Sequence, residues 1–200
     1  MRRYTMTTLA ALLFVAPAVI AWTSVANTLV VQPESRLWIN GSSTMRSFEC
    51  KAASFDAVVE STGPGAVRAV LAGEKAVSGV EFRVPANRLD CGNGTMNDHM
   101  LKALKAKDHP EIVFRLSSYD VAKAAAGVEG SATGSLTIGG VTKPITMTGT
   151  AAELDGGTLR VKGSHEIRMK EYGLKPPTLM LGTLKVDERV KVSFDLLLKE

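Results

Sequence analysis

Histidine is the residue type in this 200-residue chain best suited to bind a metal, and there are three of them. Neutral imidazole is a common metal ligand. His99 and His109 are ten residues apart, however, whereas two ligands on one helical face are three or four residues apart. His165 is far from both in the sequence. The spacing favours histidines that lie at the surface or line an opening, and we expect no metal site and no cofactor.

The sequence carries none of the common catalytic patterns. It has no nucleophile elbow, no paired histidine and carboxylate spacing, and no phosphate-binding glycine loop. The pair Gly139-Gly140 is typical of a turn. We therefore expect a protein that is not an enzyme, and the alternative is a catalytic site assembled from several strands.

The first 26 residues have the pattern of a secretory signal peptide. Arg2 and Arg3 precede an apolar run over residues 9–21, and small residues follow up to Ala26. The run is shorter than the ~20 apolar residues that a membrane span needs. We expect cleavage after Ala26, in slight preference to Ala21, and a periplasmic or secreted protein with no membrane span. Residues 27–200 are then long enough for one domain.

Charge gives no indication of a nucleic-acid partner. The chain has 24 basic and 20 acidic residues, a net charge of +4, and loss of residues 1–26 would remove two arginines and no acid, which leaves +2. The remaining charges alternate in sign and form no basic stripe.

Cys50 and Cys91 are the only cysteines. An even number of cysteines in an exported chain favours a single disulfide over two free thiols. The bond would close a loop of about 40 residues, which stabilises a fold by roughly 3–4 kcal/mol in the chain-entropy treatment. A metal site would need more ligands than two cysteines supply.

The elements that must position these residues are mostly strands. Two alternating runs flank Gly139-Gly140 within residues 133–149, which predicts a tight antiparallel hairpin. Six further strands are predicted at residues 36–40, 45–60, 77–85, 111–121, 158–169 and 188–199. In the run 45–60 the alternation slips by one residue after Ala53, which predicts a bulge. Eight strands without crossover helices predict an all-β fold, an antiparallel sheet closed on itself.

One short helix is expected between strands. From Thr95, the predicted N-cap, the period changes to about four, and the helix ends at Asp108-His109-Pro110. Its apolar side carries Met96, Met100 and Leu104, and its other side carries Lys102, Lys105 and Lys107. With Arg46, these lysines could meet a phosphate headgroup, but a solvated helix face is the preferred interpretation. Residues 61–75 are predicted to be a loop, and residues 172–185 a connection with the apolar centre Leu179-Met180-Leu181.

The ordered motifs resemble those of the YceI-like family over nearly all of residues 27–200. They are Gly41-Ser42-Ser43-Thr44 before Phe48, the strand 80–85, the segment 96–105 followed by His109-Pro110-Glu111-Ile112-Val113-Phe114, the segment 134–144, and Glu171-Tyr172-Gly173-Leu174. The resemblance implies an eight-stranded antiparallel lipocalin-like barrel around a hydrophobic tunnel. In some members of the family this tunnel holds a polyisoprenoid.

A barrel of about eight strands is either just filled by side chains or wide enough for one slender ligand. The interior candidates, selected by alternation and size, are Trp38, Phe48, Phe55, Phe82, Phe114, Leu136, Ile138, Ile145, Met147, Ile167, Met169 and Phe194. The first hypothesis is an exported protein that binds an isoprenoid or another lipid there. The alternative is an envelope or stress-response barrel with a filled interior that acts through protein-protein contacts. The oligomeric state stays open.

Overall fold

The computed structural model describes residues 27–125, 127–179 and 183–200. The predicted signal segment 1–26 lies outside them, as do Met180 and Leu181 of the predicted apolar connection. The elements are β1 (Asn27–Val31), β2 (Arg36–Ser42), β3 (Ser47–Ala52), β4 (Asp56–Ser61), α1 (Ala66–Leu71), β5 (Val77–Pro85), η1 (Ala86–Arg88), β6 (Leu89–Asp90), α2 (Gly94–Ala103), β7 (Glu111–Ala124), β8 (Gly127–Ile138), β9 (Val141–Leu154), β10 (Thr158–Arg168), η2 (Met169–Tyr172), β11 (Thr178–Leu179), β12 (Leu184–Lys185) and β13 (Arg189–Lys199).

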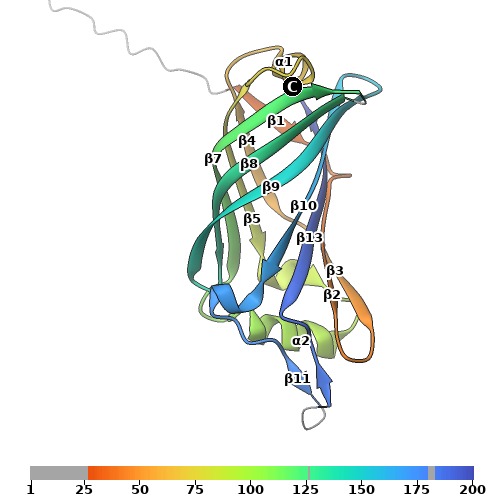
Figure 1. Ribbon diagram of the computed structural model, residues 1–200, viewed down its shortest axis with the longest axis vertical. Helices are drawn as coiled ribbons and strands as arrows, with labels where there is room; N and C mark the ends of the chain where they lie inside the picture. The colour runs from red at the N-terminus through yellow and green to blue at the C-terminus, as the bar shows by residue number, and fades with distance from the viewer. Residues whose placement is uncertain (1–26, 126, 180–182) are drawn as a thin grey trace, which may run out of the picture.

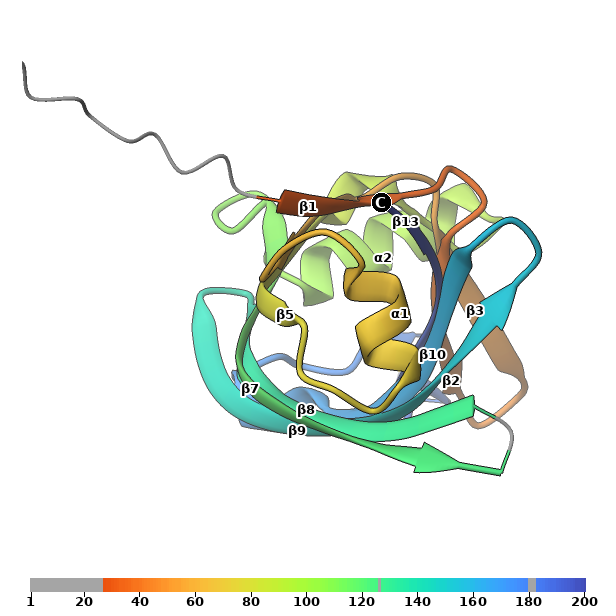
Figure 2. The same ribbon diagram turned by 90° about the horizontal axis from the view of Figure 1, so that it is seen from above.

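Eight strands form a closed antiparallel barrel in the order β1-β4-β5-β7-β8-β9-β10-β13, and β1 pairs with β13 to close it. The predicted all-β barrel is therefore confirmed, and Figure 2 shows the ring from above. The hairpin predicted around Gly139-Gly140 is the β8–β9 connection, where both glycines have positive φ. Strand β1 escaped the sequence analysis, which began the first strand at Arg36.

The predicted long strand 45–60 is divided into two strands with different neighbours. Strand β3 pairs with β2 and β6, whereas β4 pairs with β1 and β5. The predicted slip after Ala53 is therefore larger than a bulge, because residues 53–55 leave the ladder altogether. As a result β2, β3 and β6 extend the wall beyond the ring at one end of the barrel, next to α2 (Figure 1).

Helix α1 covers the opposite end of the barrel and corrects the prediction of a loop over residues 61–75 (Figure 2). The carboxylate of Glu200 accepts hydrogen bonds from the backbone N–H groups of Gly65 and Val67 at the start of α1, at 3.1 and 3.0 Å. These bonds lower the pKa of the Glu200 carboxyl. Beneath α1 lies a cluster of buried side chains: Leu29, Val59, Ala66, Val67, Val70, Ala76, Val128, Ala151, Leu159 and Leu198. This end of the barrel is filled.

Helix α2 begins at a different cap from the one predicted. Asn93, not Thr95, is the N-cap, and its side-chain oxygen accepts a hydrogen bond from the N–H of Met96 at 3.1 Å. Asparagine is a strong N-cap because its short amide reaches the free N–H groups of the first turn. Neither helix of the described part is long and apolar enough to cross a membrane.

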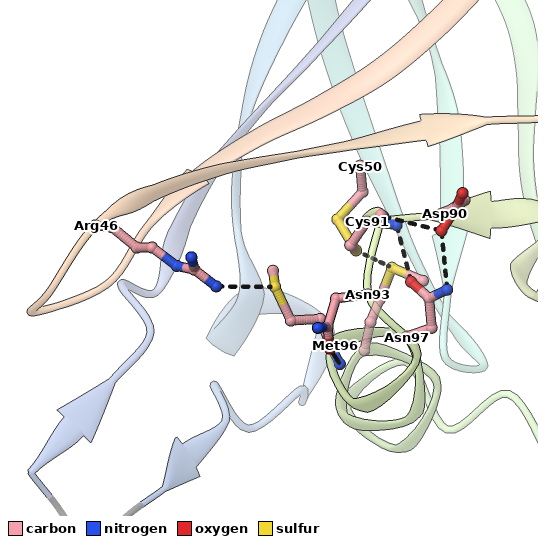
Figure 3. The surroundings of a disulfide bond; sticks show 9 residues. Arg46, Cys50, Asp90, Cys91, Asn93, Met96 and Asn97 are labelled. Carbon is pink, nitrogen blue, oxygen red and sulfur yellow. Dashed lines mark hydrogen bonds between the residues drawn. A yellow bond between two sulfur atoms is a disulfide. The ribbon is translucent and has the colours of Figure 1, made fainter.

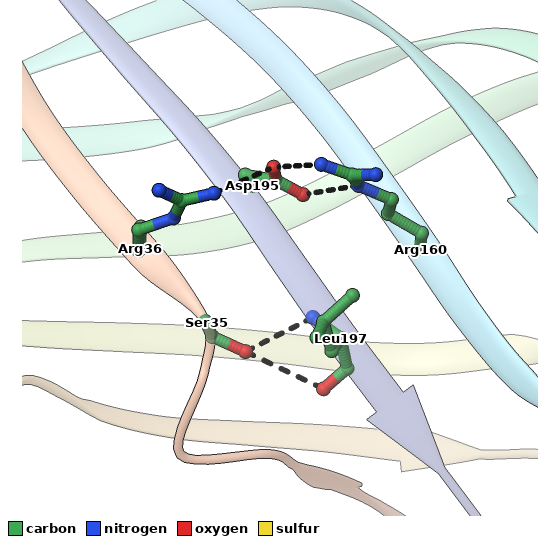
Figure 4. Close-up of polar contacts among 5 residues, drawn as sticks. All are labelled: Ser35, Arg36, Arg160, Asp195 and Leu197. Atoms are coloured by element: carbon green, nitrogen blue, oxygen red, sulfur yellow. Dashed lines mark hydrogen bonds and ion pairs between the residues drawn. The ribbon is translucent and has the colours of Figure 1, made fainter. Parts of the chain in front are cut away.

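An ion pair stabilises the outer face where β2, β13 and β10 meet (Figure 4). Arg160 donates two hydrogen bonds to the buried carboxylate of Asp195, at 2.8 and 2.6 Å, and Arg36 lies 3.9 Å from it. Strand β13 is also joined to the bend between β1 and β2, because the N–H of Leu197 donates to the hydroxyl of Ser35 at 2.9 Å. The hydrogen bonds from Arg160 lower the pKa of the Asp195 carboxyl, although burial of this carboxyl acts in the opposite direction.

We expect Asp195→Asn to destabilise the protein at pH 7 by about 1–2 kcal/mol, because it removes a charge-assisted bidentate pair that is partly open to solvent. A lowered folded-state pKa stabilises the fold above the unfolded value of ~3.9, and this contribution is lost as the pH falls through the folded value. The difference between wild type and variant should therefore shrink below about pH 4. Urea unfolding at pH 7 and pH 3 measures both effects.

Asp120→Asn is the matched control. Asp120 also forms an ion pair, with Lys75 at 2.8 Å, but its side chain is 82% exposed. Exposed pairs contribute little, so this variant should change the unfolding free energy by less than ~1 kcal/mol. Equal losses in the two variants would contradict the account of Asp195.

Candidate ligand cavity

The barrel is hollow at the end opposite α1. A cavity of about 450 Å³ lies between α2 and the inner faces of β2, β3, β5, β7, β8, β9, β10 and β13. Its volume is within the ~300–1,000 Å³ typical of small-molecule sites. Side chains of alternate residues form the wall because successive residues of a strand point to opposite faces of the sheet.

Ten of the twelve predicted interior residues line this cavity. They are Phe48, Phe82, Phe114, Leu136, Ile138, Ile145, Met147, Ile167, Met169 and Phe194. The wall therefore combines aromatic and aliphatic side chains from most of the strands. Whether these residues bind a ligand stays a prediction.

Trp38 is absent from the cavity lining, contrary to the sequence prediction. Its neighbours Leu37 and Ile39 line the cavity, so the tryptophan points to the outer face of β2. There it borders a shallow depression that also includes Ser193 and Asp195. The prediction gave more weight to the size of the side chain than to the alternation along the strand.

Phe55 is the second residue that the structure places elsewhere. It lies in the break between β3 and β4, and its ring centroid is 6.1 Å from that of Phe82. Phe82 lines the cavity, whereas Phe55 borders a separate depression beside β1. The break in the ladder therefore removes Phe55 from the alternation that its position in a continuous strand would have given it.

Three cavity-lining phenylalanine rings lie against glycines of the wall. A methyl group added at Gly41 would lie 2.4 Å from the ring of Phe48, and one at Gly163 would lie 2.4 Å from the ring of Phe194. One at Gly134 would lie 2.6 Å from the ring of Phe114 and 2.3 Å from the backbone oxygen of Arg115. The first two pairs are direct cross-strand partners. Because glycine has no side chain, each ring can lie close to the backbone of the wall.

One side of α2 forms another wall of the cavity. The lining residues Met96, His99, Met100, Ala103 and Leu104 have the spacing of one helical face. The predicted apolar side of the helix, with Met96, Met100 and Leu104, therefore faces the cavity. None of Lys102, Lys105 and Lys107 lines the cavity.

The predicted disulfide between Cys50 and Cys91 is present (Figure 3). It links β3 to the segment that leads into α2, and both cysteines line the cavity. The side chain of Asn97 supports this link, because it accepts a hydrogen bond from the N–H of Cys91 at 2.8 Å and donates one to Asp90 at 2.9 Å. The bond to Asn97 also lowers the pKa of Asp90. Helix α2 is therefore fixed to the barrel wall beside the cavity.

The cavity opens between the β2–β3 turn and the start of α2. Among its described lining residues, Arg46, Asn93 and Thr95 are exposed, and the remaining ones are buried or half-buried. Ser43 shapes the turn, since its hydroxyl accepts a hydrogen bond from the N–H of Arg46 at 3.2 Å. The hydroxyl of Thr44 donates to the carbonyl of Thr183 at 3.0 Å, which ties the turn to the segment before β12. The opening is therefore held by hydrogen bonds from two sides.

Few polar residues face the cavity. They are Ser43, Arg46, Asn93, Thr95, His99 and His165, and the described lining contains no carboxylate. His109 lies elsewhere, with its ring against Gly140 in the β8–β9 turn. Among the described residues, no cluster of three or more His, Cys, Asp or Glu side chains could hold a metal ion. Of the residues that the sequence offered for a phosphate headgroup, Arg46 lines the cavity and the three helix lysines do not, and two of the three histidines, His99 and His165, also line it.

The comparisons with known proteins agree with this geometry. Residues 36–198 match the model of the YceI-like domain. Among solved structures, BcnA of Burkholderia cenocepacia is 22% identical, with a TM-score of 0.65, and the alignment covers 82% of this chain and 96% of that one. A polyisoprenoid-binding domain from Saccharophagus degradans is 14% identical, with a TM-score of 0.60 and coverage of 86% and 97%. The YceI protein of Campylobacter jejuni is 17% identical, with a TM-score of 0.56 and coverage of 74% and 82%. A comparison with curated proteins gave no match.

Proposed function

The chain belongs to the YceI-like family, and from this premise we propose that it is an exported binding protein that holds an extended apolar molecule, an isoprenoid or another lipid, inside its barrel. The observation that carries the proposal is the hollow end of the barrel, lined by aromatic and aliphatic side chains. The polyisoprenoid-binding domain of Saccharophagus degradans, which has a similar fold, supports the same ligand class.

Binding would depend on burial of the ligand. Each methylene group removed from water contributes about 0.8 kcal/mol, so a long chain gains affinity with few polar contacts. The rings that lie against wall glycines leave space for such a chain. The cluster beneath α1 closes the other end, so the ligand would enter between the β2–β3 turn and α2.

The site is proposed to bind and not to transform its ligand, and the protein to act in the periplasm or outside the cell. The six polar residues of the described lining come from three regions, the β2–β3 turn, α2 with its N-cap, and β10, and no hydroxyl among them is paired with a histidine by a hydrogen bond in the described part. The cavity of about 450 Å³ argues against the alternative of a completely filled barrel that acts only through its surface.

Native mass spectrometry of the protein purified from its own exported fraction tests this function. We expect a mass that exceeds the chain without residues 1–26 by one ligand, and organic extraction should release a molecule with a long apolar chain. A folded protein that carries nothing, and that also fails to bind added isoprenoids and fatty acids after delipidation, would contradict the proposal.

A further inference from the structure

We propose that the ligand of this cavity carries an anionic headgroup, a carboxylate or a phosphate, that binds Arg46 at the opening. This inference rests on the proposed function and specifies the class of lipid. It follows from the distribution of charge in the cavity, from the guanidinium at the opening, and from the position of the opening relative to the filled end.

The ionisable side chains of the described cavity lining are all basic. Arg46 is the only arginine or lysine of the described lining, two histidines are the other residues that can become cationic, and no described lining residue is acidic. A cationic headgroup would therefore find no carboxylate there. An anionic headgroup would find a guanidinium, which binds carboxylates and phosphates through two parallel hydrogen bonds.

The guanidinium of Arg46 has no acidic partner within the described part of the chain. Its side chain lies 3.9 Å from the sulfur of Met96, over the first turn of α2 (Figure 3). The nearest acid in the sequence, Glu49, interacts with Lys51 and Asn40 instead, at 3.5 and 3.1 Å. One N–H group of the guanidinium thus donates to the Met96 sulfur, a weak acceptor, and no oxygen atom of the described residues accepts from the guanidinium.

The position of the opening determines which end of the ligand meets Arg46. The opposite end of the barrel is filled by the buried apolar cluster beneath α1, and the lining of the cavity away from the opening is almost entirely apolar. A charged headgroup would lose its hydration there without gaining a partner, which is costly. The apolar chain would therefore enter first, and the headgroup would stay at the opening near Arg46 and His99.

His165 is the polar residue that the headgroup would meet if the ligand were bound in the opposite orientation. It lies on β10 opposite Val192 of β13, faces the cavity, and is half-buried. A ligand that enters headgroup first would place its polar end near this imidazole. Variants of the two residues therefore distinguish the two orientations.

The test measures the dissociation constants of palmitate, hexadecanol and hexadecylamine for delipidated protein by competition with one fluorescent apolar probe. The three ligands share one chain and differ in the headgroup. We expect palmitate to bind most tightly, about tenfold better than hexadecanol, with hexadecylamine weakest. The dissociation constant of geranylgeranyl phosphate is then compared with that of palmitate, which shows whether the protein prefers a prenyl phosphate or a fatty acid.

Arg46→Gln should remove the preference for palmitate over hexadecanol and leave the affinity for hexadecanol unchanged. Lys102→Gln is the matched control, because Lys102 is an exposed cation of α2 that does not line the cavity. It should keep the full preference. His165→Gln should keep it as well.

Each contrary result has a separate meaning. Equal affinities of wild type for palmitate and hexadecanol would overturn the anionic headgroup and leave the proposed function in place. A preference lost in His165→Gln and kept in Arg46→Gln would overturn the headgroup position at the opening. Failure of every chain-bearing ligand to bind the delipidated wild type would overturn the proposed function itself.

Discussion

Val192→Trp should reduce the amount of ligand bound to the purified protein at least tenfold, so that most of the protein carries no ligand. Val192 lines the cavity from β13, between Val190 and Phe194, which also line it. An indole placed there would occupy space that the apolar chain needs, and the affinity that depends on burial of methylene groups would be lost with it. Native mass spectrometry of the two proteins, purified in parallel, measures the change.

Lys191→Trp provides the control on the adjacent position of the same strand. Lys191 is exposed on the outer face, so the same large side chain there should leave ligand content unchanged. Excess volume in a packed core costs typically 1–3 kcal/mol, so the thermal transition of both variants should be recorded. Val192→Phe serves as the smaller obstruction if Val192→Trp does not fold. A fully loaded and folded Val192→Trp would show that the ligand lies elsewhere.

The double variant Cys50→Ala/Cys91→Ala should lose about 3–4 kcal/mol of unfolding free energy. The two cysteines are 41 residues apart, and the chain-entropy treatment gives roughly this value for such a loop. The link also joins α2 to β3 beside the cavity, so ligand should dissociate faster from the variant. Urea unfolding measures the first effect, and exchange of a bound fluorescent lipid measures the second.

Reduction of the wild type is the matched comparison. A reductant should lower the stability of the wild type toward that of the double variant and leave the variant unchanged. Thiol labelling of the denatured, unreduced wild type should give a count near zero. Two labelled thiols, or a double variant as stable as the wild type, would contradict the stabilising role of the bond.

Alternation of side chains accounts for most of what the sequence predicted. The strand Val77–Pro85 is predicted with its observed bounds, and the bounds of the predicted strands over residues 158–169 and 188–199 differ from the observed ones by one residue. Long strands buried on one face repeat the same signal many times, which makes it robust. Of the twelve interior residues that this signal predicted, ten line the cavity.

Short or discontinuous elements were harder to predict. Helix α1 has six residues, fewer than two full turns, so its sequence has no room to repeat a helical period. Trp38 was misplaced because its size was given more weight than the alternation with Leu37 and Ile39, and Phe55 was misplaced because it lies where the ladder breaks. The proximity of Arg46 to α2 depends on contacts between distant segments, which no local pattern contains.

The width of the tunnel depends on residues that do not form its inner surface, because phenylalanine rings of the lining lie against glycines of the wall. The rings of Phe48, Phe114 and Phe194 can lie close to the wall only while Gly41, Gly134 and Gly163 have no side chain. Gain of a single methyl group at Gly41 or Gly163 would push the facing ring inward and narrow the bore, although the residues that face the ligand stay the same. Related barrels with identical linings could therefore select chains of different thickness through positions that never touch the ligand.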